Sequence, residues 1–138
     1  GIKHCNRLEQ ILARSNLSSD EGIMLDENEN VISVTQGNIY LVIGNTLLTP
    51  KLDKCGVVGT RRSLILELAK SLNIEVKEGL ISADKLKQAD EVFISNSVIG
   101  IQSVKSIEGD SLGDNPLTEE IKAAFKGKTQ DIKSWTCF

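Results

Sequence analysis

The sequence predicts a mixed α/β domain in which antiparallel hairpins alternate with packing helices. Several apolar runs of strand length are joined by short polar or glycine-containing turns, as in residues 38–43 and 46–49 around Gly44 and Asn45. Other segments place apolar residues three and four positions apart, which is the spacing of one helix face. The chain has 138 residues, of which 40% are hydrophobic, so it has the size of one domain with a real core.

The first half of the chain is expected to hold one helix followed by two hairpins. Leu8, Ile11 and Leu12 lie at helical spacing. The polar run 27–30 separates two short apolar runs, as a hairpin turn does. The expected elements are, in order, a helix at 4–16, a hairpin at 22–26 and 31–32, a second hairpin at 38–43 and 46–49, and a loop at 50–59.

The second half alternates helices with single strands. An apolar stripe at helical spacing predicts the longest helix of this half; its members are Leu64, Ile65, Leu68, Ala69 and Leu72. Ser82 is a typical cap for a short helix, and Asn115 before Pro116 is typical of a helix start. The expected elements are a helix at 60–72, a strand from 74–76, a helix at 83–89, strands at 91–95 and 101–107, a turn at 109–110, and a helix at 116–126.

Composition and charge disfavour several classes of function. The formal net charge is −3 and the basic residues are scattered, so no nucleic-acid partner is expected. No apolar run approaches the ~18 residues of a membrane-spanning helix. Cys5, Cys55 and Cys137 have no CxxC spacing, which predicts reduced thiols in a cytoplasmic protein. His4 is the only histidine in the sequence, so no metal site is expected.

Three short segments contain residue types that can carry chemistry. Lys3 precedes the first expected helix, and a lysine amine can bond covalently to an aldehyde cofactor. Residues 56–61 open a helix, where the amides of Thr60 and Arg61 can bind a phosphate. Asn96 and Ser97 follow a strand, a place where α/β proteins present polar groups. Each segment also has an ordinary interpretation: a solvated lysine, a glycine-containing helix cap and a plain loop.

Taken in order, these segments resemble the class IV pyridoxal-phosphate enzymes, which include branched-chain and D-amino-acid aminotransferases and 4-amino-4-deoxychorismate lyases. Residues 1–10, GIKHCNRLEQ, are most similar to the lysine segment of the lyases, and residues 96–101 resemble their substrate-side strand end. Residues 35–40, 47–49 and 56–59 match the general class pattern. The resemblance implies that residues 1–138 form the larger C-terminal domain of that fold, a mixed sheet with packing helices.

With pyridoxal 5'-phosphate as the implied cofactor, the resemblance assigns a role to each residue. Lys3 would hold the cofactor covalently and then carry protons as its free amine. The amides of Thr60 and Arg61 would take the phosphate, and Ser97 would donate its hydroxyl to the same group. Val57 would pack on the pyridine ring.

The sequence departs from the family pattern in two ways. The family places a glutamate five residues before the asparagine matched to Asn38, and this chain has Ser33 there. That glutamate keeps the pyridine nitrogen protonated, whereas a neutral hydroxyl cannot hold the proton strongly. The smaller N-terminal domain of the family, which forms one wall of the active site, is absent from the 138 residues.

The function implied by the resemblance is that of a lyase, which converts 4-amino-4-deoxychorismate into 4-aminobenzoate and pyruvate in folate biosynthesis. Asn96 would contact the substrate, and the enzyme would be a cytoplasmic homodimer completed by the N-terminal domain or a second polypeptide. Two alternatives stay open. One is an aminotransferase of the same class, for branched-chain or D-amino acids, and the other is a domain without catalysis of its own.

Overall fold

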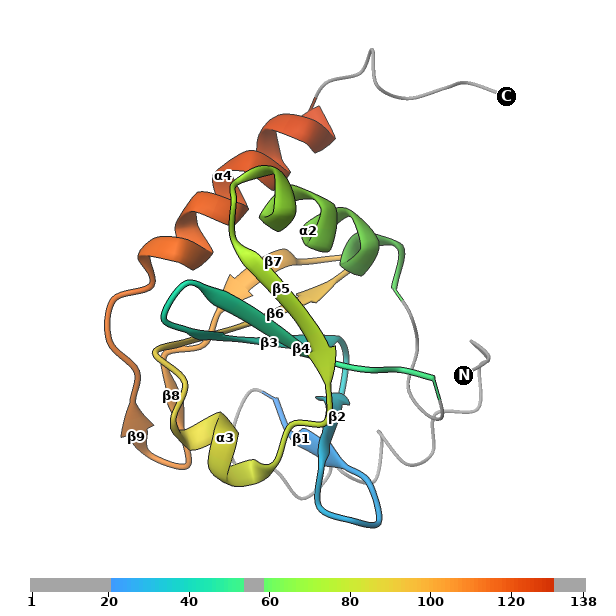
Figure 1. Cartoon of the computed structure of the whole chain (residues 1–138), viewed down its shortest axis with the longest axis vertical. Helices are drawn as coiled ribbons and strands as arrows, with labels where there is room; N and C mark the ends of the chain where they lie inside the picture. The colour runs from blue at the N-terminus through green and yellow to red at the C-terminus, as the bar shows by residue number, and fades with distance from the viewer. Residues whose placement is uncertain (1–20, 54–58, 131–138) are drawn as a thin grey trace.

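The computed structural model describes residues 21–53 and 59–130, so the helix expected at 4–16 and all three cysteines lie outside the described residues. A five-stranded mixed sheet with the order β5-β4-β3-β6-β7 forms the centre of the fold. Helices α2 and α4 cover one face of this sheet, while α3 and the small β1-β2 sheet lie against the other (Figure 1). The mixed α/β class predicted from the sequence is confirmed.

The elements follow the order expected from the sequence. Their bounds are β1 Ile23–Leu25, β2 Val31–Val34, β3 Asn38–Ile43, β4 Thr46–Pro50, α2 Thr60–Ser71, β5 Glu75–Gly79, α3 Ala83–Lys87, β6 Glu91–Asn96, β7 Gly100–Ser103, β8 Ser106–Ile107, β9 Asp110–Ser111 and α4 Pro116–Gln130. Strand β3 pairs antiparallel with β4 and with β6, whereas β4 and β5 are parallel and are connected by α2.

Both faces of the central sheet are buried, which gives the domain two apolar cores. Tyr40 and Phe93 point to the helix side, where they pack with residues of α2 and α4 such as Ile65. Ile39 and Val92, their neighbours in the same strands, point to the opposite side. This alternation follows from the two-residue period of a strand. It explains why β3 and β6 are continuous apolar runs in the sequence.

The strand expected at 101–107 is interrupted in the structure. Strand β7 ends at Ser103, and residues 106–107 then pair with 110–111 in a separate small hairpin. Glu108 and Gly109, which form the turn of that hairpin, both have positive φ angles, 51° and 91°. A turn was expected at 109–110; the structure has it one residue earlier, with Asp110 already in β9, and the chain leaves the central sheet before reaching it.

The start of α4 is stabilised by a residue from a distant strand. Asn115 precedes the helix as expected, but its side-chain amide donates to the carbonyl of Gly113 instead of capping the helix. The capping group is the carboxylate of Glu91, at the beginning of β6. Its two oxygens accept the amides of Leu117 at 3.0 Å and Thr118 at 2.7 Å. Glu91 is 4% exposed, so these bonds lie in the interior.

We expect Glu91→Ala to lower the free energy of unfolding by about 2–3 kcal/mol, because two buried helix amides would lose a charged acceptor. Urea unfolding followed by circular dichroism measures this change. Glu91→Gln keeps one carbonyl oxygen and should lose about half as much. Glu120→Ala, at an exposed position of the same helix, is the matched control and should change stability by less than about 0.5 kcal/mol. Equal midpoints for Glu91→Ala and Glu120→Ala would show that the cap contributes nothing.

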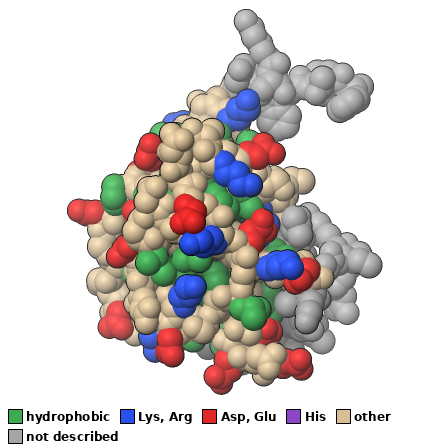
Figure 2. Space-filling view, in the orientation of Figure 1, with side chains coloured by type: hydrophobic (Ala, Val, Ile, Leu, Met, Phe, Trp, Pro, Cys, Tyr) green, Lys and Arg blue, Asp and Glu red, His purple; other side chains and the backbone are tan. Residues whose placement is uncertain are grey.

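The surface carries charges of both signs. On the face seen in Figure 2, Lys and Arg side chains are interspersed with Asp and Glu. Such mixing provides no extended basic stripe on this face, in agreement with the scattered charges in the sequence. None of the helices in the described part of the chain is long and apolar enough to cross a membrane.

Candidate functional site

Polar groups from three elements meet at one edge of the central sheet, which we call the polar edge. It comprises Asn38 at the start of β3, Ser95 and Asn96 at the end of β6, and Gly59 just before α2. Asn38 pairs directly with Ser95 in the sheet register. A Cβ atom placed on Gly59 would lie 2.7 Å from Oδ1 of Asn38, so a larger residue at this position would displace the Asn38 side chain.

The first turn of α2 presents backbone amides at this edge. Gly59 is the N-cap, with extended dihedral angles and no side-chain hydrogen bond to the helix. Its carbonyl accepts the amides of Arg62 and Ser63. No residue in the described ranges accepts the amides of Thr60 or Arg61, and the first turn contains no acidic side chain. Free amides at the positive end of a helix dipole fit a phosphate group.

The turn after β6 is built by Asn96. Its Oδ1 accepts the amides of Val98 and Ile99, both at 2.8 Å, and this arrangement holds residues 96–99 in a compact turn. Ser97 lies on this turn with an exposed side chain. The oxygen of Asn96 is thus occupied in shaping the loop. A contact of Asn96 with a substrate stays a prediction. Such a contact would have to use the side-chain nitrogen, because the oxygen is already bonded within the turn.

Of the other residues with predicted roles, the structure describes the surroundings of Arg61 and Ser33 but not those of Lys3 and Val57. The side chain of Arg61 lies over the ring of Phe125 in α4, 5.3 Å from the ring centroid, so the predicted phosphate contact would have to use its backbone amide. Ser33 is half-buried on β2, where it pairs with Met24 of β1, and its hydroxyl makes no hydrogen bond to another described residue. Lys3 and Val57 lie outside the described residues, so their roles stay predictions.

Tyr40 lies directly behind the polar edge. Its hydroxyl is 2.9 Å from Oγ of Ser95, and its ring stacks on Phe93 with the centroids 4.5 Å apart. Burial raises the pKa of Tyr40 to about 12. The phenol therefore stays protonated at neutral pH and supports the edge through its hydrogen bond with Ser95.

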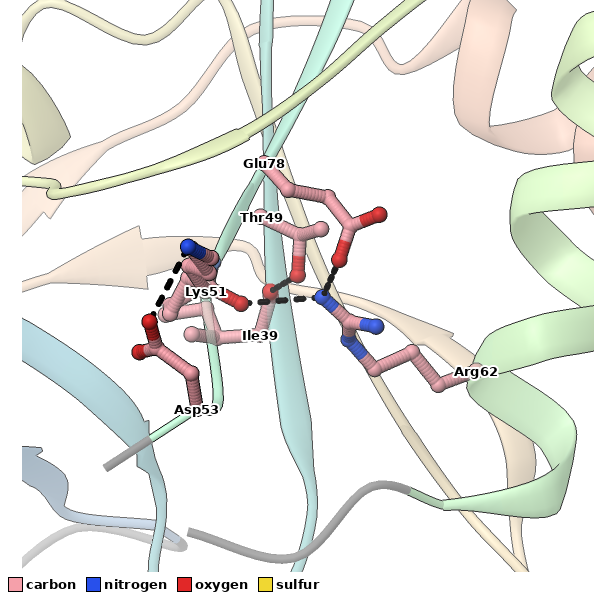
Figure 3. A network of polar contacts seen from close by, with 7 residues as sticks. Ile39, Thr49, Lys51, Asp53, Arg62 and Glu78 are labelled. Carbon is pink, nitrogen blue, oxygen red and sulfur yellow. Dashed lines mark hydrogen bonds and ion pairs between the residues drawn. The ribbon is translucent and has the colours of Figure 1, made fainter. Parts of the chain in front are cut away.

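The sequence analysis missed Arg62, which is the third residue of α2. It is 5% exposed and bonds through Nη2 to the carbonyl of Pro50 and the carboxylate of Glu78, as Figure 3 shows. The sequence contained one signal for it. Arg62 lies three, four and seven residues before the buried residues Ile65, Leu66 and Ala69, on the helix face that packs inward.

Comparison with known proteins identifies the family of this chain. Residues 1–107 match the family described as amino-transferase class IV. The branched-chain-amino-acid aminotransferase of Salmonella typhimurium is 36% identical over 122 residues, which cover 83% of this chain and 40% of that protein. The aminodeoxychorismate lyase of Vibrio harveyi is 34% identical over 110 residues, which cover 78% of this chain and 41% of that protein.

A solved structure has a similar fold. The 4-amino-4-deoxychorismate lyase of Pseudomonas aeruginosa superposes with a TM-score of 0.85 at 36% identity, over 98% of this chain and 50% of that one. The chain therefore spans about half the length of the relatives it matches. It belongs to the class IV aminotransferase family, whose enzymes use pyridoxal 5'-phosphate as their cofactor.

Proposed function

We propose that this chain is the cofactor domain of a 4-amino-4-deoxychorismate lyase, which forms 4-aminobenzoate and pyruvate. The observation that carries the proposal is the polar edge. There α2 begins with the open amides of Thr60 and Arg61, close to the paired strands β3 and β6, and β6 ends at Asn96. That edge fits the phosphate of pyridoxal 5'-phosphate. When bound, the cofactor supplies a sink for the electrons released at the amine-bearing carbon of the substrate.

Each predicted site residue other than Ser33 has a defined part in this proposal. The amides of Thr60 and Arg61 and the hydroxyl of Ser97 hold the phosphate, and Asn96 shapes the turn that presents Ser97. Lys3 would hold the cofactor covalently, and its free amine would accept the proton from the amine-bearing carbon of the substrate. Val57 packs on the ring of the cofactor.

An aminotransferase of the same class is the second candidate, because the aminotransferase and lyase relatives are about equally similar to the chain. Residues 1–10 and the segment Asn96-Ser97 favour the lyase, since both resemble lyase segments. Ser33 favours it too, because elimination of pyruvate makes the ring aromatic. That driving force lets the lyase work with a weaker electron sink than transamination requires.

Another part of the enzyme must cover the polar edge so that water is excluded during catalysis. Next to Ser97, the side chains of Val98 and Ile99 are 92% and 46% exposed. We propose that this apolar pair packs against the polypeptide that corresponds to the half of the relatives not spanned by this chain. The enzyme assembled in this way would act as a homodimer.

Product analysis tests the proposed reaction. The chain is supplied together with the polypeptide of the other half and pyridoxal 5'-phosphate, and 4-amino-4-deoxychorismate is added. We expect equal amounts of 4-aminobenzoate and pyruvate, with little amino transfer from branched-chain or D-amino acids to 2-oxoglutarate. The opposite ratio of activities would favour the aminotransferase. No cofactor absorption on titration of the chain would contradict both candidates.

We expect Ser97→Ala to weaken cofactor binding by about 1–2 kcal/mol, or roughly 5–30-fold, the scale of a hydrogen bond to a charged group. The loss should affect pyridoxal 5'-phosphate and spare pyridoxal, because only the former carries the phosphate. Absorbance titration measures both affinities. Ser97→Thr keeps a hydroxyl and should retain most of the affinity, and Ser111→Ala, exposed on β9, is the control. Equal losses for both ligands would place Ser97 away from the phosphate.

A further inference from the structure

Arg62 is an unusual residue to find buried in the first turn of a helix. Its side chain is 6% exposed, and its neighbours on the buried face of α2 are Ile65, Leu66 and Ala69. Burying a guanidinium is costly unless it is paired and hydrogen-bonded. A neutral apolar side chain could fill this core position without the cost of burying a charge. The presence of an arginine therefore requires another explanation.

The guanidinium joins two strands of the sheet to the helix that connects them. Its Nη2 donates to the carbonyl of Pro50, the last residue of β4, at 2.9 Å and to Oε2 of Glu78 in β5 at 2.7 Å (Figure 3). In the register of these parallel strands, Pro50 pairs with Gly79, the residue after Glu78. One nitrogen atom therefore holds the beginning of α2 against the ends of both strands.

The strand ends that receive Arg62 are themselves tied together. The hydroxyl of Thr49 donates to the carbonyl of Ile39 at 2.9 Å, which links β4 to β3. The amide of Lys51 donates to the carbonyl of Gly79 at 3.1 Å, which extends the pairing of β4 with β5. Arg62 thus contacts a rigid part of the sheet, and any shift of the helix start would break its bonds.

Two contacts together fix the position of the Thr60 and Arg61 amides. On one side Gly59 lies against the side chain of Asn38, which a Cβ atom on residue 59 would displace. On the other side Arg62 is bonded to Pro50 and Glu78. The two amides lie between these contacts in the chain. Donors that are already oriented bind an anion more strongly, because no reorganisation is needed when the ligand arrives.

The hydrogen bonding of Arg62 is incomplete. Nε is buried and has no hydrogen-bond partner among the described residues, and the side chain of Glu78 is 45% exposed. A buried N–H group without a partner destabilises a fold. The arrangement therefore does not maximise the stability of the domain.

We propose that Arg62 is a positioning residue for the cofactor phosphate. Through Pro50 and Glu78 it holds the first turn of α2 in the orientation that aims the amides of Thr60 and Arg61 at the phosphate. This inference rests on the proposed cofactor site, but it concerns a residue that does not touch the cofactor itself.

The phosphate increment, the ratio of the affinity for pyridoxal 5'-phosphate to that for pyridoxal, tests this role. We expect Arg62→Met to lower the increment about tenfold while the affinity for pyridoxal changes less than about twofold. Arg62→Lys should restore part of the increment, because an ammonium group can reach one acceptor but not two. Glu78→Gln keeps an acceptor and should cause a smaller loss. Glu67→Gln, on the exposed face of α2, is the control.

The outcomes separate positioning from simple stabilisation. Equal losses of affinity for both ligands, accompanied by a lower melting temperature, would mean that Arg62 only supports the fold and would overturn the proposal. If Arg62→Met does not fold, Arg62→Lys and Glu78→Gln give the answer, and an unchanged increment in both would also overturn it.

A second measurement keeps the inference separate from the proposed function. Inorganic phosphate is titrated into the full chain, and the amide signals of Thr60 and Arg61 are followed by nuclear magnetic resonance. Saturable shifts that weaken in Arg62→Lys support the positioning role even if the chain binds no cofactor, in which case only the proposed function fails. Identical shifts in the wild type and the variant would overturn the positioning role while leaving cofactor binding intact.

Discussion

Lys3→Arg is expected to abolish the covalent attachment of the cofactor and to lower turnover about 10²–10⁴-fold, the range lost with a general acid-base group. Arginine keeps the positive charge but stays protonated, so it can neither bond to an aldehyde nor accept a proton from the substrate. The prediction rests on the similarity of residues 1–10 to the lysine segment of the lyases. It therefore does not depend on the part of the chain that the structure describes.

Borohydride reduction of the holo protein followed by peptide mapping measures the attachment. The label should appear on the Lys3 peptide of the wild type and should be absent from Lys3→Arg. Lys70→Arg, an exposed position on α2, is the control and should keep both label and activity. Added methylamine should restore part of the turnover of Lys3→Ala, since it supplies the missing amine. A label on Lys51, Lys54 or Lys70 in the wild type would contradict the assignment of Lys3.

The strands and helices of this domain were predictable because their signals are local. The hairpin of β3 and β4 follows from two apolar runs around Gly44, which adopts a positive φ of 59°. Ser82 caps α3 as its sequence context predicts, accepting the amide of Lys85. In each case the residues that decide the structure lie within a few positions of one another.

The features that sequence analysis missed depend on partners far apart in the chain. Arg62 is stabilised by Glu78, 16 residues later, and α4 is capped by Glu91, about 26 residues earlier. A charged residue gives no local sign that it will be buried beside a distant partner. For the same reason the apolar stripe of α2 was only partly correct: Leu64, Leu68 and Leu72 are partly buried, while Arg62 and Leu66 face the core.

The candidate site also combines features that local sequence predicts with features that depend on distant partners. A glycine before a helix and polar residues after a strand are local patterns, so Thr60, Arg61 and Ser97 could be proposed from the sequence. That the start of α2 lies near the end of β6 depends on the pairing of Asn38 with Ser95 and on the contact of Gly59 with Asn38. The use of the Asn96 oxygen within its own turn was equally hidden, because it depends on the conformation of the loop.

Ser33→Glu, in the protein assembled with its other half, is expected to raise aminotransferase activity about 10²-fold, the scale of a well-placed charge in an active site. Lyase activity should rise much less. Ser33 stands where the family carries a glutamate, and a serine hydroxyl can bond a neutral ring nitrogen without stabilising its protonated form. A carboxylate would raise the pKa of that nitrogen and deepen the electron sink. Transamination needs the deeper sink more than an elimination driven by aromatisation does.

The control for this experiment is Ser33→Gln, which has the size of glutamate but no charge and should change neither activity in the same way. The absorption spectrum of the bound cofactor reports the protonation of the ring independently of turnover. If Ser33→Glu raises both activities from near zero, the serine is a disabling replacement, not an adaptation to the lyase reaction. If activities and spectrum stay unchanged, residue 33 does not lie at the ring nitrogen. The ordinary role of Ser33 would then be the one visible on β2, a half-buried residue paired with Met24.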